Sequence, residues 1–259
     1  ENARVMGGVN RESAEAGRDL YGMFVRGDIY LTDATTAEMV KLMENTSRDI
    51  NIAIANEFSR LADHFHVDIY EAIGLANKHP RIQILNPGVG VGGHCIGVDP
   101  WFLVEAAPEI SPLIRTARQV NDAQPGFIVS LIKRLFEGDL VGKRIAALGL
   151  TYKADVDDVR ESPAVEIVHL LAQDGALVRA YEPFRPDFRV EGIETCDNLN
   201  STLEGSDLIV ILVGHSQFKN IVPADVARIT ESRLVLDVPG VWQNSGWREI
   251  GFTICRLSV

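Results

Sequence analysis

The sequence contains 259 residues with 46% hydrophobic and 24% charged side chains, which is enough apolar material for one large domain or two ordinary ones. Its formal net charge of −11 excludes nucleic acid as the main partner, because binding to a phosphate backbone needs a broad basic face. No apolar run approaches the roughly 20 residues that span a bilayer, and the three widely spaced cysteines favour a cytoplasmic protein with no membrane partner, disulfide framework or structural metal site.

Residues 1–32 are predicted to form one strand, one helix and a second strand. ARVMGGVN and DIYLT have strand character, and RESAEAGRDLYGMFV between them has helical composition. A single strand–helix–strand passage cannot bury both of its faces. We therefore expect residues 1–32 to be the last part of a larger domain.

The next segment is predicted to begin with one long helix. Asp33 or Thr35 can cap a helix that continues for about thirty residues without proline or glycine. Its apolar residues recur with a helical period: Met39, Leu42, Met43, Ile50, Ile54, Phe58, Leu61 and Phe65. A helix of this length usually serves as a spine between domains or as a dimer surface.

Two further helical segments follow the long helix. Residues 69–79 are predicted to form a short helix that ends at Pro80, and residues 111–137 are predicted to be helical with a break or kink at Pro125. Residues 33–124 are therefore expected to form a helical central domain.

From residue 142 onward the pattern is that of an α/β domain. Apolar strand patterns such as KRIAALGL, ALVRAYEP, DLIVILVG, RLVLDVPG and FTICRL are separated by helical ones such as SPAVEIVHLLAQDG. This alternation predicts a parallel, doubly wound sheet with helices on both faces. Ligands bind such sheets at the carboxyl ends of the strands, where the first strand leads into a polar loop with Lys153 and Arg160.

The segment NPGVGVGGHCIGVDP, residues 86–100, places five glycines around Cys95. The glycines could cradle a phosphate, bring a substrate close to a reactive sulfur, or build a tight turn around a packed cysteine. A dinucleotide-binding turn needs a strand directly before its glycines and a helix directly after them. Gly97 and Pro100 make a poor helix start, so the residues disfavour that turn and leave the other two interpretations open.

Three segments, in order along the chain, resemble the nucleotide-sugar 6-dehydrogenases, the family of UDP-glucose and GDP-mannose dehydrogenases. They are AEMVKLMENTSRDINIAIANE, NPGVGVGGHCIGVDPWFL and GLTYKADVDDVRESPA. The second is most similar to the UDP-N-acetylmannosamine branch. The resemblance implies an α/β protein in which a helical central dimerisation domain, residues 33–124, precedes a Rossmann-like UDP-binding domain, residues 125–259. Residues 1–32 would then be the remnant of an NAD-binding Rossmann domain.

The resemblance also implies a reaction and its catalytic residues. Such enzymes oxidise the sugar C6 hydroxyl to a carboxylate by two hydride transfers to NAD. The intermediate aldehyde is held on a cysteine, here Cys95, as a thiohemiacetal that becomes a thioester. Lys41 and Asn45, four residues apart on one helix face, would hydrogen-bond the C6 oxygen. Asp99 would be the partner of Lys41 and of the hydrolytic water.

Substrate-binding residues follow from the same resemblance. They lie in and before the glycine-rich segment and after the first strand of the α/β domain: Arg81, Asn86, Gly88, Gly90, Gly92, Tyr152, Lys153 and Arg160. Arg81 corresponds to a residue that reaches the substrate of the neighbouring subunit, which implies a homodimer. No residue of the chain is assigned to NAD, because the glycine turn of the NAD-binding domain is not expected here.

One departure from the family pattern concerns phosphate binding. The sequence DVPG places Pro239 where relatives usually carry a basic residue. A lost charge-assisted phosphate contact removes roughly 1.5–3 kcal/mol of binding free energy. We therefore expect weak binding of UDP.

Each assignment has a structural alternative. Lys41 and Asn45 could be ordinary polar residues of an amphipathic helix, and Asp99 could simply begin a turn before Pro100. The histidines, His94 and His215 among them, and the two remaining cysteines are expected to have no catalytic role. The chain could also be a catalytically silent nucleotide-sugar-binding and dimerisation fragment, and its substrate could be UDP-glucose or UDP-N-acetylglucosamine.

Overall fold

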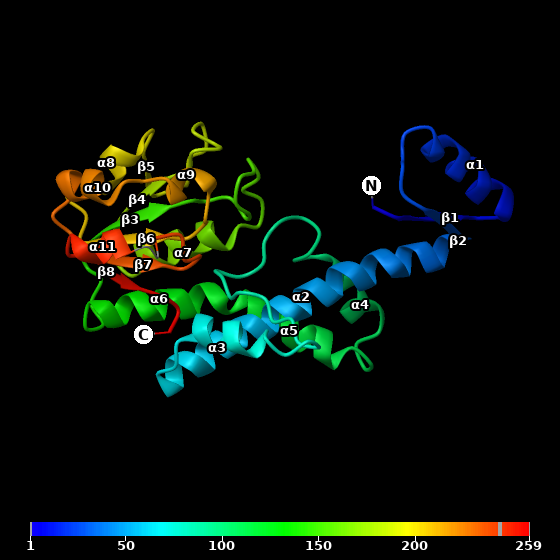
Figure 1. The fold of residues 1–259 in the computed structure, drawn as a ribbon, viewed down its shortest axis with the longest axis horizontal. Coiled ribbons are helices and arrows are strands. Elements are labelled where there is room, and N and C mark those ends of the chain that lie inside the picture. Colours follow the sequence, from blue (N-terminus) through cyan, green and yellow to red (C-terminus); the bar gives the residue numbers. More distant parts are fainter. Residues whose placement is uncertain (1, 243–244, 259) are drawn as a thin grey trace.

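The three predicted parts follow one another in the computed structural model, which describes residues 2–242 and 245–258 (Figure 1). The first part consists of β1 (Arg4–Gly8), α1 (Arg11–Gly22) and β2 (Ile29–Asp33), and its two strands pair in parallel. The predicted strand, helix and strand are thus confirmed. This unit lies at the far end of the long helix from the large sheet (Figure 1).

The predicted long helix is α2 (Ala34–Phe65), which has 32 residues. Asp33 caps it, because its carboxylate accepts a hydrogen bond from the backbone N–H of Thr36 at 2.9 Å. The helix ends at His66, whose φ of 55° is the left-handed conformation common after helix ends. None of the helices in the described part of the chain is long and apolar enough to cross a membrane.

The buried face of α2 is largely polar, and much of its apolar face is exposed. Much of the predicted apolar stripe is exposed, by 41–66% at its most open positions: Met39, Met43, Ile54, Phe58, Leu61 and Phe65. The buried side carries alanines together with the polar residues Asn45, Thr46, Asp49, Asn56 and Ser59. The helix therefore packs against its own chain through a polar face.

The other helices of the central part are α3 (Ile69–Ala76), α4 (Asp99–Ala106) and α5 (Pro112–Asp122), followed by α6 (Gln124–Leu135). The break predicted at Pro125 lies at Ala123, and the proline sits in the first turn of α6, where its missing N–H is harmless. Pro100 occupies the same position in α4. Residues 94–98, directly after the glycines, form a turn and not a helix, as expected, and α4 begins only at Asp99.

The C-terminal part is a six-stranded, fully parallel sheet. Its strands are β3 (Arg144–Leu148), β4 (Leu177–Tyr181), β5 (Glu194–Thr195), β6 (Leu208–Ile211), β7 (Leu234–Asp237) and β8 (Thr253–Cys255). Their order is β5-β4-β3-β6-β7-β8, and every neighbouring pair is parallel. Chain order reverses between β3 and β6, which is where a doubly wound sheet opens its ligand crevice.

Helices cover both faces of this sheet, as predicted. On one face, α6 and α7 (Pro163–Gln173) contribute Ile132 and Ile167 to the larger apolar core. On the other face pack α8 (Leu199–Leu203), α9 (Ser216–Lys219), α10 (Pro223–Ile229) and α11 (Ser245–Glu249). The predicted α/β fold with a helical central part and a Rossmann-like C-terminal sheet is thus confirmed.

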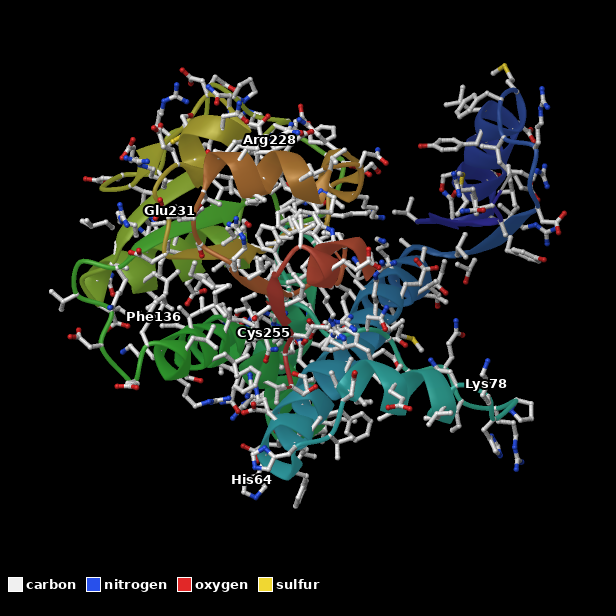
Figure 2. All side chains as sticks on the ribbon, turned by 60° about the vertical axis from the view of Figure 1, so that its left-hand side comes forward. His64, Lys78, Phe136, Arg228, Glu231 and Cys255 are labelled. Atoms are coloured by element: carbon white, nitrogen blue, oxygen red, sulfur yellow. The ribbon has the colours of Figure 1, made fainter. Side chains whose placement is uncertain are left out.

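The C-terminal strands also contact the central helices. The Tyr70 hydroxyl on α3 donates to the carbonyl of Val238 at 2.7 Å, and the guanidinium of Arg256 lies 3.2 Å from the centre of the Tyr70 ring. Burial raises the pKa of Tyr70 well above its usual range, so the phenol stays neutral and keeps donating. Figure 2 places Cys255 of β8 in this interior, whereas His64 lies at the surface at the end of α2.

Candidate active site

The glycine loop, residues 86–98, packs directly against the loop that follows β3, residues 149–162. The backbone N–H of Gly93 donates to the carbonyl of Arg160 at 3.0 Å. A Cβ at Gly93, whose φ is +81°, would lie 3.0 Å from the Tyr152 ring, and one at Gly92 would lie 2.3 Å from the carbonyl oxygen of Glu161. These glycines are required because the two loops touch through their backbones.

Cys95 lies in the turn that leads from the glycine loop into α4. Its carbonyl oxygen accepts hydrogen bonds from the backbone N–H groups of Val98 at 3.0 Å and Asp99 at 2.8 Å. The thiol is half-buried. The turn thus fixes Cys95 one helical turn from the Asp99 carboxylate and leaves its sulfur within reach of a ligand.

The predicted polar group beside Cys95 is present as a chain of hydrogen bonds. Lys41 Nζ donates to Asn45 Oδ1 at 3.0 Å, and Asn45 Nδ2 donates to Asp99 Oδ2 at 2.5 Å. Lys41 Nζ also lies 3.9 Å from a carboxylate oxygen of Glu44. The expected Lys41–Asp99 pair is therefore bridged by the amide of Asn45, because α2 presents both side chains four residues apart on the face that meets α4.

A buried network of polar side chains on α2 and α5 holds the start of the glycine loop. Arg118 on α5 donates to Asp49 Oδ1 at 2.6 Å, and Asn121 donates to the same oxygen at 2.8 Å. Asn56 on α2 donates to Asn121 at 2.9 Å and accepts from the backbone N–H of Gly88 at 3.0 Å. The polar face of α2 thereby fixes α5 and the start of the glycine loop.

A second polar cluster holds the loop after β3. Glu182, at the end of β4, accepts hydrogen bonds from the N–H groups of Leu150 at 2.6 Å and Thr151 at 3.0 Å, and lies 3.2 Å from His215 Nε2. The N–H of Asp155 donates to His215 Nδ1 at 3.0 Å. The imidazole therefore accepts at Nδ1 and donates at Nε2. Burial raises the pKa of Glu182, but these hydrogen bonds outweigh it and lower that pKa overall.

Two histidines were expected to have no role, and both have partners in the structure. His215 is fully buried and connects the loops after β3 and β6, as described above. The ring of His94 is exposed, and its Nδ1 lies 2.8 Å from Cys95 Sγ. Periodicity and spacing could not find either partner, although a histidine directly before a candidate nucleophile was a signal for the second.

The cationic residues predicted for the nucleotide differ in their availability. Arg160 forms a two-pronged pair with Asp158, at 2.9 and 2.7 Å, and these hydrogen bonds hold the pKa of the Asp158 carboxyl at about 2. Lys153 is exposed on the same loop. Of these two cations on the loop after β3, Lys153 is therefore more available than Arg160 to bind an anion.

Three sequence-predicted positions lie outside this group of contacts. Arg81 is exposed between α3 and the glycine loop, and Asn86 is exposed at the start of that loop. Pro239 follows β7 in a turn whose backbone N–H groups, from 240 to 242, are accepted by the buried carboxylate of Asp237. Pro239 itself packs against Gly214, with 3.0 Å between its Cβ and the position of a Gly214 Cβ.

A cleft of about 310 Å³ borders the other side of the glycine loop. Its lining includes Gly93, Gly97 and Trp101, and also the acidic residues Asp122 and Glu166. Burial and the charge of Asp122 raise the pKa of Glu166, so the cleft is unfavourable to further negative charge.

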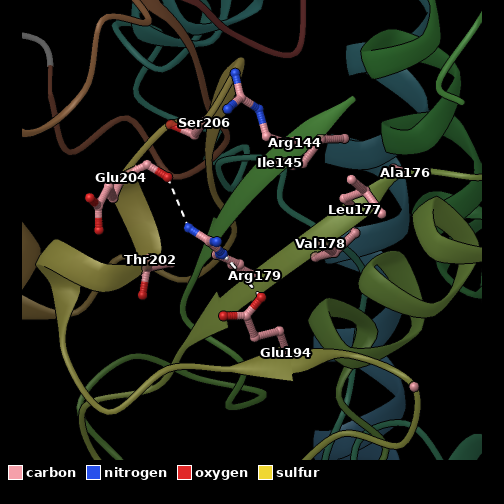
Figure 3. A pocket seen from close by; sticks show the side chains of 11 residues that line it. Arg144, Ile145, Ala176, Leu177, Val178, Arg179, Glu194, Thr202, Glu204 and Ser206 are labelled. Carbon is pink, nitrogen blue, oxygen red and sulfur yellow. Dashed lines mark hydrogen bonds and ion pairs between the residues drawn. The ribbon is translucent and has the colours of Figure 1, made fainter. Parts of the chain in front are cut away.

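A second cavity, of about 290 Å³, lies over β3, β4 and β5 (Figure 3). Its central cation, Arg179, is already bonded to Glu194 at 3.1 Å and to the carbonyl of Glu204 at 2.9 Å. Arg144, which also lines it, begins β3, so the cavity reaches the amino end of that strand. Ligands of doubly wound sheets bind at the opposite end, and we therefore exclude this cavity as the active site.

Two family models match this chain. One describes the central domain of the UDP-glucose/GDP-mannose dehydrogenase family and matches residues 35–123. The other describes the UDP binding domain of the same family and matches residues 146–244. Together they span the glycine loop, α2 and the crevice of the sheet.

The chain belongs to the UDP-glucose/GDP-mannose dehydrogenase family.

Relatives within the family include a UDP-N-acetyl-D-mannosamine dehydrogenase of Methanocaldococcus jannaschii, which is 48% identical over 99% of this chain and 59% of its own length. An NDP-N-acetyl-D-galactosaminuronic acid dehydrogenase of Ralstonia nicotianae is 47% identical over 93% of this chain and 56% of its own. The structure of a UDP-D-ManNAc dehydrogenase from Pyrococcus horikoshii superimposes with a TM-score of 0.86 at 40% identity, over 99% of this chain and 60% of that one. The chain thus spans about 60% of the length of these UDP-sugar dehydrogenase relatives.

Proposed function

We propose that this member of the UDP-glucose/GDP-mannose dehydrogenase family supplies the substrate-binding and covalent-catalytic part of an NAD-dependent UDP-N-acetylmannosamine 6-dehydrogenase. The observation that carries the proposal is the meeting of three segments around the turn that carries Cys95. Asp99, whose N–H donates to the Cys95 carbonyl, is joined through Asn45 to Lys41, and Gly93, two residues before Cys95, packs against Tyr152 of the UDP binding domain. The relatives named above, which are dehydrogenases of N-acetylated nucleotide sugars, support the choice of substrate class.

The residues divide the chemistry between them. Cys95 adds to the C6 aldehyde and holds it, so that the half-oxidised sugar cannot leave. Lys41 and Asn45 donate hydrogen bonds toward the C6 oxygen, where negative charge develops when the sulfur adds. Asp99, already hydrogen-bonded to Asn45, orients that amide and the water that hydrolyses the thioester.

The glycine loop does not fit an NAD site. Gly88, Gly90 and Gly93 have the spacing of a dinucleotide turn, but within residues 77–98 the structure contains no strand before them. The helix that follows starts at Asp99, six residues after Gly93. A dinucleotide turn needs both elements directly adjacent, so we assign the hydride acceptor to no residue of this chain.

The nucleotide site follows from the crevice of the sheet. We assign the UDP group to Tyr152 and Lys153, on the loop at the carboxyl end of β3, and the sugar to the backbone of the glycine loop. Calorimetry of this chain should therefore show weak UDP binding and no saturable NAD binding. Pro239→Arg should tighten UDP binding by about one to two orders of magnitude, which corresponds to a regained contact of roughly 1.5–3 kcal/mol.

The exposed apolar stripe of α2 supports a homodimer. Met43, Phe58 and Phe65 are each more than 40% exposed on one helix that is too long to be covered by α3 and α5. Contiguous apolar surface of this kind is typical of protein interfaces. Light scattering at micromolar concentration should report a dimer or larger species, whereas Phe58→Glu should shift it toward the monomer. A monomer in both cases would contradict the assignment.

The decisive test measures turnover in a protein that carries this chain together with an NAD-binding domain. Cys95→Ala should abolish NADH formation from UDP-N-acetylmannosamine, Cys95→Ser should stall it, and Cys196→Ala serves as the matched control with full activity. Undiminished NADH formation by Cys95→Ala would refute the proposed mechanism. UDP-glucose, UDP-N-acetylglucosamine and UDP-N-acetylgalactosamine assayed in parallel decide the sugar.

A catalytically silent binding and dimerisation fragment is the second candidate. The misfit between the described residues and NAD favours it for this chain alone. It predicts UDP binding by the chain alone without any NADH formation from UDP-N-acetylmannosamine and NAD.

A further inference from the structure

We propose that His94 is the base that removes the thiol proton of Cys95. The inference rests on the proposed role of Cys95 as the nucleophile. His94 Nδ1 lies 2.8 Å from Cys95 Sγ, which makes it a titratable side chain in direct contact with the sulfur. The backbone of Cys95 is fixed, because its carbonyl accepts hydrogen bonds from two N–H groups of the turn into α4.

Other charged groups face the pair from two elements. Arg160, Asp158 and Tyr152 lie on the loop after β3, and Asp99 begins α4. The carbonyl of Arg160 accepts a hydrogen bond from the N–H of Gly93, two residues before Cys95. The Arg160 guanidinium is already paired with Asp158 at two atoms. His94 is therefore the group that can take up a proton at the sulfur itself.

The step in question is the addition of Cys95 to the C6 aldehyde, with His94 as the proton acceptor. The S–H bond of Cys95 breaks and its proton moves to His94 Nδ1, while the sulfur electron pair forms the S–C bond to the aldehyde carbon. The carbonyl π bond breaks, and its oxygen takes a proton from water or the Lys41 ammonium. When the later thioester is hydrolysed, the Cys95 thiolate leaves and recovers the proton from His94. The exposed imidazole can also exchange that proton with solvent.

The test is the rate at which iodoacetamide alkylates Cys95 in this chain, followed by mass spectrometry of the Cys95 peptide. An unassisted thiol is about 3% ionised at about pH 7, so complete ionisation could accelerate alkylation up to about 30-fold. The lower nucleophilicity of a more acidic thiol reduces that gain to about threefold. We therefore expect His94→Asn to slow alkylation about threefold at about pH 7, and to match or exceed the wild type at about pH 9.5, where an unassisted thiol is largely ionised.

His94→Asn is the informative variant because its amide oxygen can still accept a hydrogen bond but cannot take a proton. His64→Asn, at the exposed end of α2, is the matched control, and alkylation of the half-buried Cys196 is the internal reference. Wild-type alkylation of Cys95 in His94→Asn at about pH 7 would overturn the proposal. An equal slowing at both pH values would overturn it too, since His94 would then control access to the sulfur and not its proton.

This assay needs neither sugar nor NAD, so it separates the inference from the proposed function. Retained dehydrogenase activity in Cys95→Ala would refute the function and leave the acid–base pair intact. Unchanged alkylation in His94→Asn would refute the pair and leave the function intact.

Discussion

The buried ion pair beneath the glycine loop gives the strongest prediction about stability. Asp49 has 0% exposure and Arg118 has 2%, and their nearest atoms are 2.6 Å apart. Asp49→Ala leaves the buried guanidinium of Arg118 with only the half-exposed carboxylate of Asp122, and it removes an acceptor of Asn121. Breaking a buried pair by removing one partner costs about 3–5 kcal/mol, which is a large share of the roughly 5–15 kcal/mol that stabilises a domain.

A second ion pair on the same helix provides the matched control. Asp63 of α2 accepts from Arg134 at the same distance of 2.6 Å, but the Arg134 side chain is 56% exposed. Solvent-exposed pairs contribute at most about 1 kcal/mol. Asp63→Ala should therefore lower the free energy of unfolding about 2–4 kcal/mol less than Asp49→Ala does.

Urea unfolding followed by far-ultraviolet circular dichroism measures both variants, since this signal reports the helices. With a denaturant slope of about 2 kcal/mol/M, the Asp49→Ala midpoint should fall by about 1.5–2.5 M and the Asp63→Ala midpoint by about 0.5 M or less. In a Trp101→Phe background, the fluorescence of Trp242 and Trp247, which stack in the core of the C-terminal sheet, reports that domain separately. Equal shifts of the two midpoints would refute the argument, because burial would then not determine the cost.

Three further predictions concern the loop after β3. Gly93→Ala should displace the Tyr152 ring, because the added Cβ would lie 3.0 Å from it at a φ of +81°, and calorimetry should show weaker UDP binding than in wild type. Hydrogen bonds lower the pKa of Asp158 to about 2. The hydrogen bonds to Glu182 outweigh its burial and lower its pKa as well. Both carboxylates therefore stabilise the fold above about pH 4. That stability is lost as the pH falls through the lowered values, and the melting temperature should drop between about pH 4 and about pH 2; a constant melting temperature would contradict this. His215→Ala should lower the free energy of unfolding in urea by about 1–3 kcal/mol, because it leaves the buried carboxylate of Glu182 without its ring donor. An unchanged urea midpoint would show that this hydrogen bond does not stabilise the fold.

Much of the fold could be predicted because its signals are local. The alternation of apolar strands with helices from residue 142 onward predicts a parallel sheet, and Asp33, one of the two caps predicted for the long helix, is the one that caps it. The elements β5, α8, α9 and α11 escaped prediction because segments of two to five residues carry too little periodicity. The helix α4 was missed for a different reason, since Pro100 breaks a helix interior but not a first turn.

The sequence by itself determined which residues meet a helical or strand period, where glycine loops interrupt them, and which family motifs the chain carries. Tertiary structure alone decided which face of α2 is buried: the period identified the apolar stripe, but the chain buries the polar face that carries Asp49 and Asn56. It also decided that Gly93 meets Tyr152 and that His215 joins Glu182. Periodicity depends on neighbours a few residues apart, whereas these contacts join residues more than thirty positions apart and exist only once the packing of helices and strands has brought them together.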